Sequence, residues 1–123
     1  MKHTKVDTLF GSGSLVNLIS EAIVKDLGLK TKPHVEPYPL GWVQKDTRLH
    51  VTKQCRLQFS ITSKFIDEVL FDVVPLDICR MVLGSPYLFD RKAIVYREEN
   101  KYHIFKDKVE LLLELTRLRI MNL

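Results

Sequence analysis

The clearest pattern along the chain is an alternation of apolar and polar residues over positions 49–61. Apolar side chains occupy the odd positions, except that Lys53 breaks the series, and polar side chains occupy the even positions. A period of two predicts a strand with one buried face. Residues 65–74, after a short turn, are rich in Val, Ile, Leu and Phe and end before Pro75. We therefore expect these two segments to form an antiparallel hairpin.

Two further strand patterns lie nearer the C-terminus. The segments "AIVYR" and "KYHIF" flank the polar turn Glu98-Glu99-Asn100 and predict a second hairpin. Beyond it, every second residue from Val109 to Leu115 is apolar, which favours a strand. The abundance of Leu, Glu and Arg in the same segment also suits a helix. We predict a strand, and we expect an apolar terminus of this kind to pair with another chain.

One helix is expected over residues 20–27. Ser20 can cap its N-terminus, and Gly28 can end it. Ile19 and Val24 have the spacing of a hydrophobic staple, which fixes the angle at which a chain enters a helix. The side chains expected to face the core are Ile23, Val24 and Leu27.

Residues 32–46, "KPHVEPYPLGWVQKD", interrupt the strand patterns. This stretch contains Pro33, Pro37 and Pro39, followed by Gly41. Because proline lacks a backbone donor and clusters of proline and glycine mark loops, we predict a loop that leads into a hairpin tip. Trp42 lies near that tip, where it is expected either to pack on the edge of the core or to cover a ligand.

The chain has the length of one domain, and its patterns predict an all-β fold with one or two short helices. Its 123 residues include 19 Lys and Arg against 15 Asp and Glu, a net charge of +4. Since no five like charges follow one another, a solvated surface is favoured over a nucleic-acid interface. No apolar run approaches the ~20 residues that span a membrane, and the N-terminus lacks the apolar centre of a signal peptide. We expect a soluble, intracellular protein without membrane contacts.

No metal ion or cofactor is expected. The two cysteines, Cys55 and Cys79, stand alone, and neither has a second cysteine or a histidine at metal-ligand spacing. We expect both to be small buried hydrophobic residues. The four histidines, which lie on separate segments, are His3, His34, His50 and His103.

Two segments share one design, in which an apolar strand runs into glycine and serine. The first is "TLFGSGSLVNLIS", residues 8–20, and the second is "MVLGSPYL", residues 81–88. Here the sequence resembles the retropepsin-like aspartic proteases, most closely the protease domains of plant retrotransposon (gypsy-type) polyproteins. Other matching stretches are "VNLISEAIVKDLGL", "PYPLGWVQKD", "VTKQCRLQFSI" and "VVPLDICRMVLGSPYLFDR". The resemblance extends over residues 4–106 and implies a retropepsin-like closed barrel, the acid protease fold.

The resemblance also implies roles for individual residues. The first family motif reads apolar-apolar-Asp-Ser/Thr-Gly, so Gly11 occupies the position of the catalytic aspartate and is followed by Ser12 and Gly13. The second motif, apolar-apolar-Gly, falls on Leu83 and Gly84, and the substrate-binding flap, around residues 40–46, carries Gly41, Trp42 and Val43. The implied protease domain is residues 1–107, and residues 108–123 form a divergent tail, a candidate dimer-interface strand. The implied partners are a second copy of the chain and an extended peptide or polyprotein, with no cofactor.

Glycine at position 11 removes the chemistry of this family. An aspartic protease uses two carboxylates that share one proton, and in a chain this short each copy of a homodimer supplies one. Asp7 is no substitute, because it lies about 13 Å up an extended strand at ~3.3 Å per residue. Ser12 lacks the histidine and acid of a serine nucleophile. Asp77 and Asp90 are expected in turns or on the surface.

Two other departures from the family concern assembly. Arg80 stands where family members usually have a small residue, and the residues from Lys108 onward do not match the usual family ending. A bulky cation near a dimer centre strains the packing there. The sequence thus predicts a polyprotein-cleaving endopeptidase by descent that cleaves little or nothing. The alternatives are a non-catalytic module that dimerises or binds extended peptides, and a decayed element product.

Overall fold

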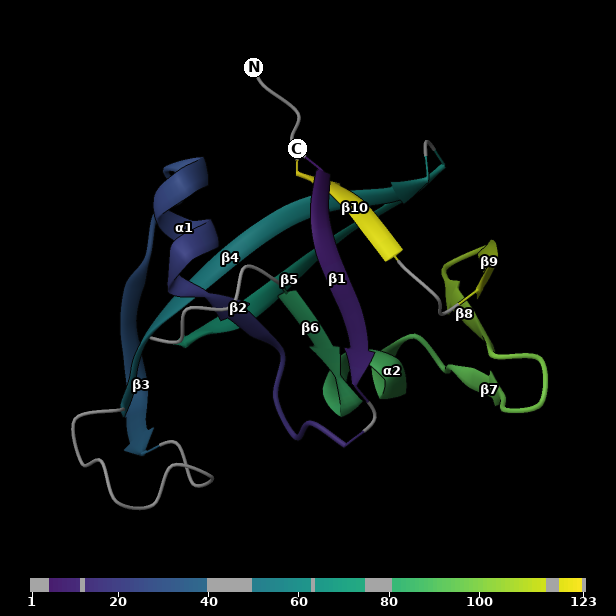
Figure 1. Ribbon diagram of the computed structural model, residues 1–123, viewed down its shortest axis with the longest axis horizontal. Helices are drawn as coiled ribbons and strands as arrows, with labels where there is room; N and C mark the ends of the chain where they lie inside the picture. Colours follow the sequence, from purple (N-terminus) through teal and green to yellow (C-terminus); the bar gives the residue numbers. More distant parts are fainter. Residues whose placement is uncertain are drawn as a thin grey trace.

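The computed structural model describes residues 5–11, 13–39, 50–62, 64–74, 81–114 and 118–122. In chain order its elements are β1 (Lys5–Gly11), β2 (Leu18–Ser20), α1 (Glu21–Leu27), β3 (Lys32–Pro39), β4 (His50–Thr62), β5 (Phe65–Val74), β6 (Met81–Gly84), α2 (Ser85–Asp90), β7 (Ile94–Tyr96), β8 (Lys101–Lys106), β9 (Val109–Glu114) and β10 (Leu118–Asn122) (Figure 1). Strands dominate this part of the chain, so the predicted all-β class with short helices is confirmed. Neither α1 nor α2 is long and apolar enough to cross a membrane.

The larger of two sheets has the strand order β10-β1-β6-β2-β5-β4-β3. In it β1 pairs with β6, and β2 with β5, in parallel, whereas the other neighbours are antiparallel. β10 also meets β4, with Met121 opposite Ser60 and Asn122 opposite Phe59, so the sheet curls back on itself there. The expected closed barrel is not formed within the described residues, because this contact is limited to the last residues of β10 and β3 extends the sheet beyond it.

β4 and β5 form the long antiparallel hairpin that the alternation predicts. Their register runs from Lys53 opposite Val73 to Ser60 opposite Ile66, and a shift near the turn then brings Thr62 opposite Phe65. The odd-numbered apolar side chains of the two strands are buried and form the centre of the core. They include Cys55, Leu57, Phe59, Val69 and Phe71.

The structure confirms the predicted helix and both of its ends. The hydroxyl of Ser20 accepts a hydrogen bond from the backbone amide of Ile23 at 3.3 Å. Gly28 ends α1 with a φ of 63°, a left-handed conformation that glycine adopts without steric cost. Both staple residues, Ile19 and Val24, are buried. The side chains of α1 that contact the core are Ile23, Val24 and the partly buried Leu27.

The prediction of a loop over residues 32–39 is wrong. This segment is β3, an edge strand that pairs antiparallel with β4, with a register shift between Pro33 and Tyr38. Its outer position leaves Val35 88% exposed. A strand at the edge of a sheet needs backbone donors on one side only, and prolines are therefore tolerated there. The predicted hairpin tip that follows lies outside the described residues.

β7, β8 and β9 form a separate three-stranded antiparallel sheet. The predicted second hairpin is confirmed as β7 and β8, and the predicted strand after it is confirmed as β9. The turn at Asp107 and Lys108 joins β8 to β9, so the expected boundary at residue 107 falls inside a hairpin. β10 pairs with β1 of the same chain, with Val6 opposite Ile120, and the expected pairing of the C-terminal segment with another chain stays a prediction. An apolar terminal strand can pair with any free edge, and the edge of β1 lies within the same molecule.

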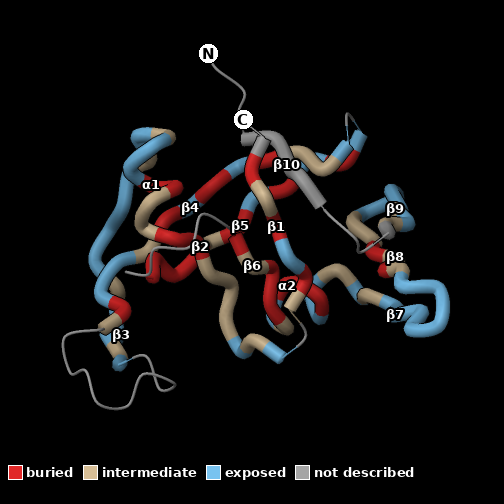
Figure 2. Tube along the Cα trace, in the orientation of Figure 1, coloured by how far each residue is buried: buried red, intermediate tan, exposed pale blue. Residues whose placement is uncertain are grey.

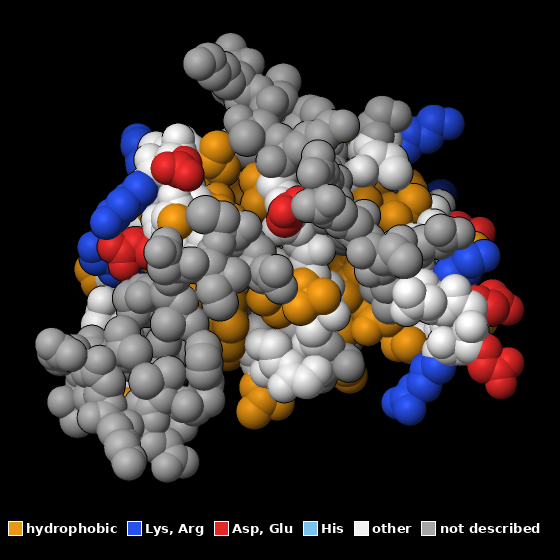
Figure 3. Space-filling model, viewed as in Figure 1, with side chains coloured by type: hydrophobic (Ala, Val, Ile, Leu, Met, Phe, Trp, Pro, Cys, Tyr) orange, Lys and Arg blue, Asp and Glu red, His pale blue; other side chains and the backbone are white. Residues whose placement is uncertain are grey.

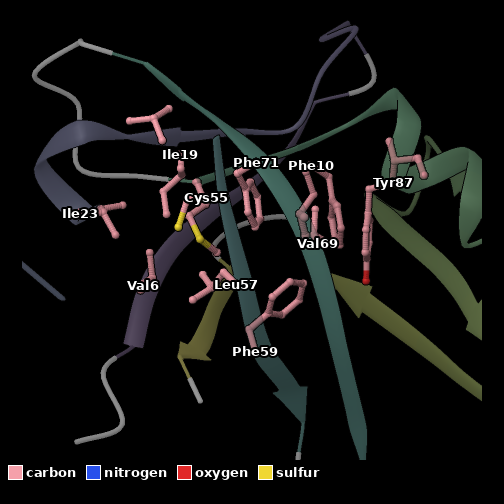
Figure 4. Close-up of a cluster of buried hydrophobic side chains, with 14 of the residues drawn as sticks. Val6, Phe10, Ile19, Ile23, Cys55, Leu57, Phe59, Val69, Phe71 and Tyr87 are labelled. Carbon is pink, nitrogen blue, oxygen red and sulfur yellow. The ribbon is translucent and has the colours of Figure 1, made fainter. Parts of the chain in front are cut away.

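One core connects the two sheets. Phe10 of β1 stacks on Tyr102 of β8 with 4.9 Å between ring centroids, and on Tyr87 of α2 with 6.4 Å. Phe59 also lies 6.4 Å from Tyr87, and Figure 4 shows Phe10, Phe59 and Tyr87 within the cluster of buried side chains. Burial is concentrated in β1, β4, β5 and β6, whereas β3 and β7 are exposed (Figure 2). Cys55 is buried, as predicted, and Cys79 lies outside the described residues.

Candidate functional site

The segment after β1 makes a tight turn. Gly11 is the last residue of β1, and its carbonyl accepts a hydrogen bond from the backbone amide of Ser14 at 2.9 Å. A bond of this span closes a four-residue β-turn. The hydroxyl of Ser14 donates to the carbonyl of Val16 at 2.7 Å and holds the chain that leaves the turn. Gly13 is exposed, and Ser12 lies outside the described residues.

The two glycine motifs lie side by side. Because β1 and β6 run parallel in register, Gly11 is the neighbour of Gly84 at the same end of both strands. Asn17, which follows the turn, accepts a hydrogen bond from the backbone amide of Gly84 through Oδ1 at 2.8 Å. Leu83, the other residue of the second motif, is completely buried beneath the unit. The described residues of the two motifs thus form one hydrogen-bonded unit, which we call the glycine pair, residues 11, 13–17 and 83–85.

A side chain at position 84 has no room. A Cβ on Gly84 would lie 2.3 Å from the carbonyl oxygen of Val16 and 2.8 Å from that of Ser14. The carbonyl of Ser14 also accepts a hydrogen bond from the backbone amide of Ser85 at 2.8 Å, which holds the two segments this close. The close approach of two backbones therefore requires glycine at position 84.

Gly11 is less confined than Gly84. A Cβ at position 11 would lie 3.0 Å from Cγ1 of Val82 and 3.6 Å from Cβ of Ser14. Gly11 does not adopt the left-handed conformation, which among the described glycines is found at Gly28. The backbone therefore accepts an aspartate at position 11, provided that the Val82 side chain gives way by a few tenths of an ångström.

The glycine pair has no carboxylate in its own segments. Residues 8–20 and 81–89 contain no Asp or Glu. Asp7 lies four residues before Gly11 on β1, in register with Arg119 of β10, and Asp90 is exposed at the end of α2. The unit offers backbone amides, hydroxyls and one carboxamide, and none of these groups can act as the general base that activates water in an aspartic protease.

Part of the expected site lies outside the described residues. It comprises Ser12, the flap residues Gly41, Trp42 and Val43, and the two residues before the second motif, Asp77 and Arg80.

Apolar side chains are exposed on both segments that follow the glycine motifs. Leu15, just after the turn, is 84% exposed, and Phe89 of α2 is 85% exposed. Figure 3 shows hydrophobic side chains at the surface along the lower part of the molecule, where Figure 1 places α2 and the end of β1. Large exposed apolar side chains next to a candidate site suit a surface that contacts another molecule.

Sequence reasoning missed a polar cluster around Asp72, a buried residue of β5. Tyr38 donates its hydroxyl to Oδ2 of Asp72 at 2.5 Å, and Gln54 donates Nε2 to Oδ1 at 3.1 Å. Nε2 of His34 lies 3.3 Å from Oδ1 of Asp72. Nδ1 of His34 accepts a hydrogen bond from the backbone amide of Glu36 at 2.9 Å. Since Nδ1 is an acceptor, Nε2 carries the proton that faces the carboxylate. Burial and the hydrogen bond to Asp72 raise the pKa of Tyr38 well above its usual range. The signal in the sequence was an aspartate within the apolar run "LFDVV".

A second buried carboxylate, Asp67 of β5, ties the two sheets together. Arg91, at the end of α2, donates from Nε to Oδ2 of Asp67 at 2.6 Å and from a terminal amino group to Oδ1 at 2.8 Å. Nζ of Lys106, on β8, lies 3.5 Å from Oδ1. Burial acts to raise the pKa of Asp67, but the hydrogen bonds led by Arg91 hold it below its usual range. The same bond raises the pKa of Arg91, and burial raises that of the adjacent Tyr87 hydroxyl.

No protein-family model matches the chain, and none of the curated proteins matches it. Within the described residues, no three side chains of His, Cys, Asp or Glu gather in a way that could hold a metal ion.

Proposed function

We propose that the chain is a retropepsin-like aspartic endopeptidase domain, derived from a retrotransposon polyprotein, in which glycine at position 11 has removed the catalytic carboxylate. The observation that carries the proposal is the pairing of Gly11 with Gly84 at the adjacent ends of two parallel strands. The turn that resembles the family's catalytic motif and the apolar-apolar-Gly motif belong to one hydrogen-bonded unit, joined by Asn17. The order of the matching stretches over residues 4–106 gives further support.

Peptide hydrolysis by this class of enzyme needs a base to take a proton from water and an acid to protonate the substrate carbonyl. Two carboxylates that share one proton supply both functions. In the proposed homodimer, each copy contributes one residue 11 to the shared centre. With glycine there, both carboxylates are absent at once, and we expect the chain to cleave little or nothing.

A second function, a non-catalytic module that dimerises or binds extended peptides, is favoured by the apolar surface beside the glycine pair. Leu15 and Phe89 are almost fully exposed there. A surface of this kind, next to strand ends, can hold an extended segment without cutting it. The two proposals share the fold and differ in whether a restored carboxylate restores hydrolysis.

Four forms of the chain separate these functions. They are the chain as it stands, Gly11→Asp, the double variant Gly11→Asp with Val82→Ala, and Gly13→Asp. Val82→Ala removes the methyl group that a Cβ at position 11 would meet at 3.0 Å. Gly13→Asp adds the same charge two residues away, where a Cβ meets nothing within 4 Å, and so controls for charge alone.

Each form is assayed on an unstructured protein substrate at mildly acid pH, with and without a transition-state analogue of aspartic proteases. We expect cleavage that the analogue blocks from Gly11→Asp, more from the double variant, and none from the chain as it stands or from Gly13→Asp. If neither aspartate variant at position 11 cleaves although both remain folded, the non-catalytic module becomes the better account.

A further inference from the structure

A pocket of about 390 Å³ lies between α1 and the start of β4. From α1 it is lined by Glu21, Val24 and Lys25, whose spacing of three and four residues places them on one face of the helix, and Gly28, just after the helix, also lines it. Small-molecule sites typically measure ~300–1,000 Å³, so the pocket is large enough for a compact ligand. None of its lining residues belongs to β1 or β6, so the pocket is separate from the glycine pair and its use does not depend on the proposed protease function.

Lys53, the residue that breaks the alternation of β4, lines the pocket. In the β4–β5 register it lies opposite the buried Val73, which also lines the pocket. A lysine side chain keeps its ammonium group in solvent while its methylene groups cover apolar surface. Thr52 and Lys53 are both exposed in the wall of the pocket.

The pocket has an apolar floor and a polar wall. Its floor is formed by Val24 and Val73, which are nearly buried, together with Leu29. The wall adds the polar residues Thr31 and Thr52. The lining residues come from α1 and the turn after it, from the first half of β4 and from the end of β5. A ligand that fits must therefore combine a small apolar body with a polar head.

The charges of the wall favour an anionic head. Lys25 forms an ion pair with Glu21 on the same helix, at 3.0 Å between Nζ and Oε1, and these two charges cancel. Within the described part of the chain, Lys53 makes no salt bridge. His50, on the same strand, also lines the pocket. The uncompensated charge is thus positive, and hydrogen bonds from charged donors are the strongest available to a carboxylate or phosphate.

We propose that this pocket binds a small organic anion, a carboxylate or phosphate monoester on a compact apolar body. Lys53 supplies the charge that holds the anionic head, and Val24, Leu29 and Val73 contact the apolar body.

The test is an NMR titration of the ¹⁵N-labelled chain with phenyl phosphate and with phenylacetate. Inorganic phosphate supplies the charge without the body, and phenylacetamide supplies the body without the charge. Lys53→Gln removes the cation of the pocket. Lys108→Gln, in the exposed turn between β8 and β9, removes the same charge elsewhere and is the matched control.

We expect saturable shifts of the amides of residues 28–31 and 50–53 with at least one of the two aromatic anions, and weaker binding of inorganic phosphate and phenylacetamide. Lys53→Gln should raise the Kd about tenfold, the loss typical of one hydrogen bond to a charged group, and Lys108→Gln should leave it unchanged. The proposal is overturned if neither aromatic anion shifts these amides at millimolar concentration, or if the two lysine variants weaken binding equally.

Discussion

Asn17 accepts a hydrogen bond from the backbone amide of Gly84 through Oδ1 at 2.8 Å. Together with the bond from the amide of Ser85 to the carbonyl of Ser14, it joins the segment after the Gly11 turn to the end of β6, two parts of the chain that are far apart in sequence. Without it the amide of Gly84 would have to find another acceptor in a part-buried position, where an unmade hydrogen bond is costly. Asn17 therefore holds together the unit on which the functional proposal depends.

Asn17→Ala should destabilise the fold by about 1–3 kcal/mol, because it leaves the part-buried amide of Gly84 without its acceptor. Asn17→Asp keeps an acceptor oxygen at the same place and should cost less. Urea unfolding at neutral pH measures both variants. An unchanged unfolding midpoint for Asn17→Ala would show that the bond contributes nothing to the glycine pair.

Gly84→Ala should be among the most damaging single changes in the chain. Its Cβ would lie 2.3 Å from the carbonyl oxygen of Val16, and overpacking of this kind costs about 1–3 kcal/mol or more. Gly13→Ala is the control, since a Cβ at position 13 meets nothing within 4 Å and the expected change stays within about 0.5 kcal/mol. Thermal unfolding of the two variants should give clearly different midpoints. Equal midpoints would mean that the chain around Ser14 and Val16 moves away from Gly84 at little cost in stability.

Asp67→Asn should make stability less dependent on pH. The folded-state pKa of Asp67 is lowered by Arg91, so the pair stabilises the fold above the unfolded-state pKa of about 3.9 and loses that effect as the pH falls towards the folded-state value. At pH 7 the substitution should cost about 3 kcal/mol, because it leaves the charge of Arg91 without its partner. The cost should shrink between pH 5 and pH 3.

Urea unfolding at several pH values measures this effect, with Asp107→Asn as the control. Asp107 is exposed, in the turn between β8 and β9, and its loss should matter little at either pH. A cost for Asp67→Asn that stays constant from pH 7 to pH 3 would contradict a stabilising, ionised Asp67.

Tyr38→Phe should destabilise the pairing of the edge strand β3 with β4. The substitution removes the hydroxyl that donates to Asp72 at 2.5 Å and leaves the ring that packs against His34. The expected loss is about 1 kcal/mol, which corresponds to roughly fivefold faster hydrogen exchange of the β3 amides. Tyr96→Phe, on the exposed β7, removes a hydroxyl elsewhere and should leave β3 unchanged. Equal exchange rates in Tyr38→Phe and the unchanged chain would show that Asp72 does not fasten β3.

Local signals predicted the elements whose ends are set by nearby residues. The helix is bounded by Ser20 and Gly28, which act within one turn of it, and the β4–β5 hairpin follows from alternation within each strand. The sequence did not predict β3. Its prolines are compatible with a strand because β3 lies at the edge of the sheet, and the local sequence does not show that position. The pairing of β10 with β1 was missed for a related reason, since periodicity shows that a strand is apolar and does not show which edge receives it.

In the candidate site, too, the sequence predicted only the residues that lie in contiguous motifs. Gly11 and Gly84 could be singled out because each motif is contiguous in the sequence. The cluster around Asp72 could not, because Tyr38 lies 34 residues from it along the chain and Gln54 lies 18. The constraint from Val82 on a side chain at position 11 also depends on the packing of β6 beside β1, which no local pattern contains.

We propose, centrally, that this chain has the framework of an aspartic protease, from which glycine at position 11 has removed the catalytic carboxylate. The most direct test is cleavage of an unstructured protein by the Gly11→Asp, Val82→Ala double variant at mildly acid pH, beside the unchanged chain. We expect the variant to cleave and the unchanged chain not to cleave. A transition-state analogue of aspartic proteases should abolish cleavage by the variant. Analogue-sensitive cleavage by the unchanged chain would contradict the assignment of Gly11 to the catalytic position. A folded but inactive variant would contradict the proposal that the missing carboxylate alone prevents cleavage, and would favour the non-catalytic module.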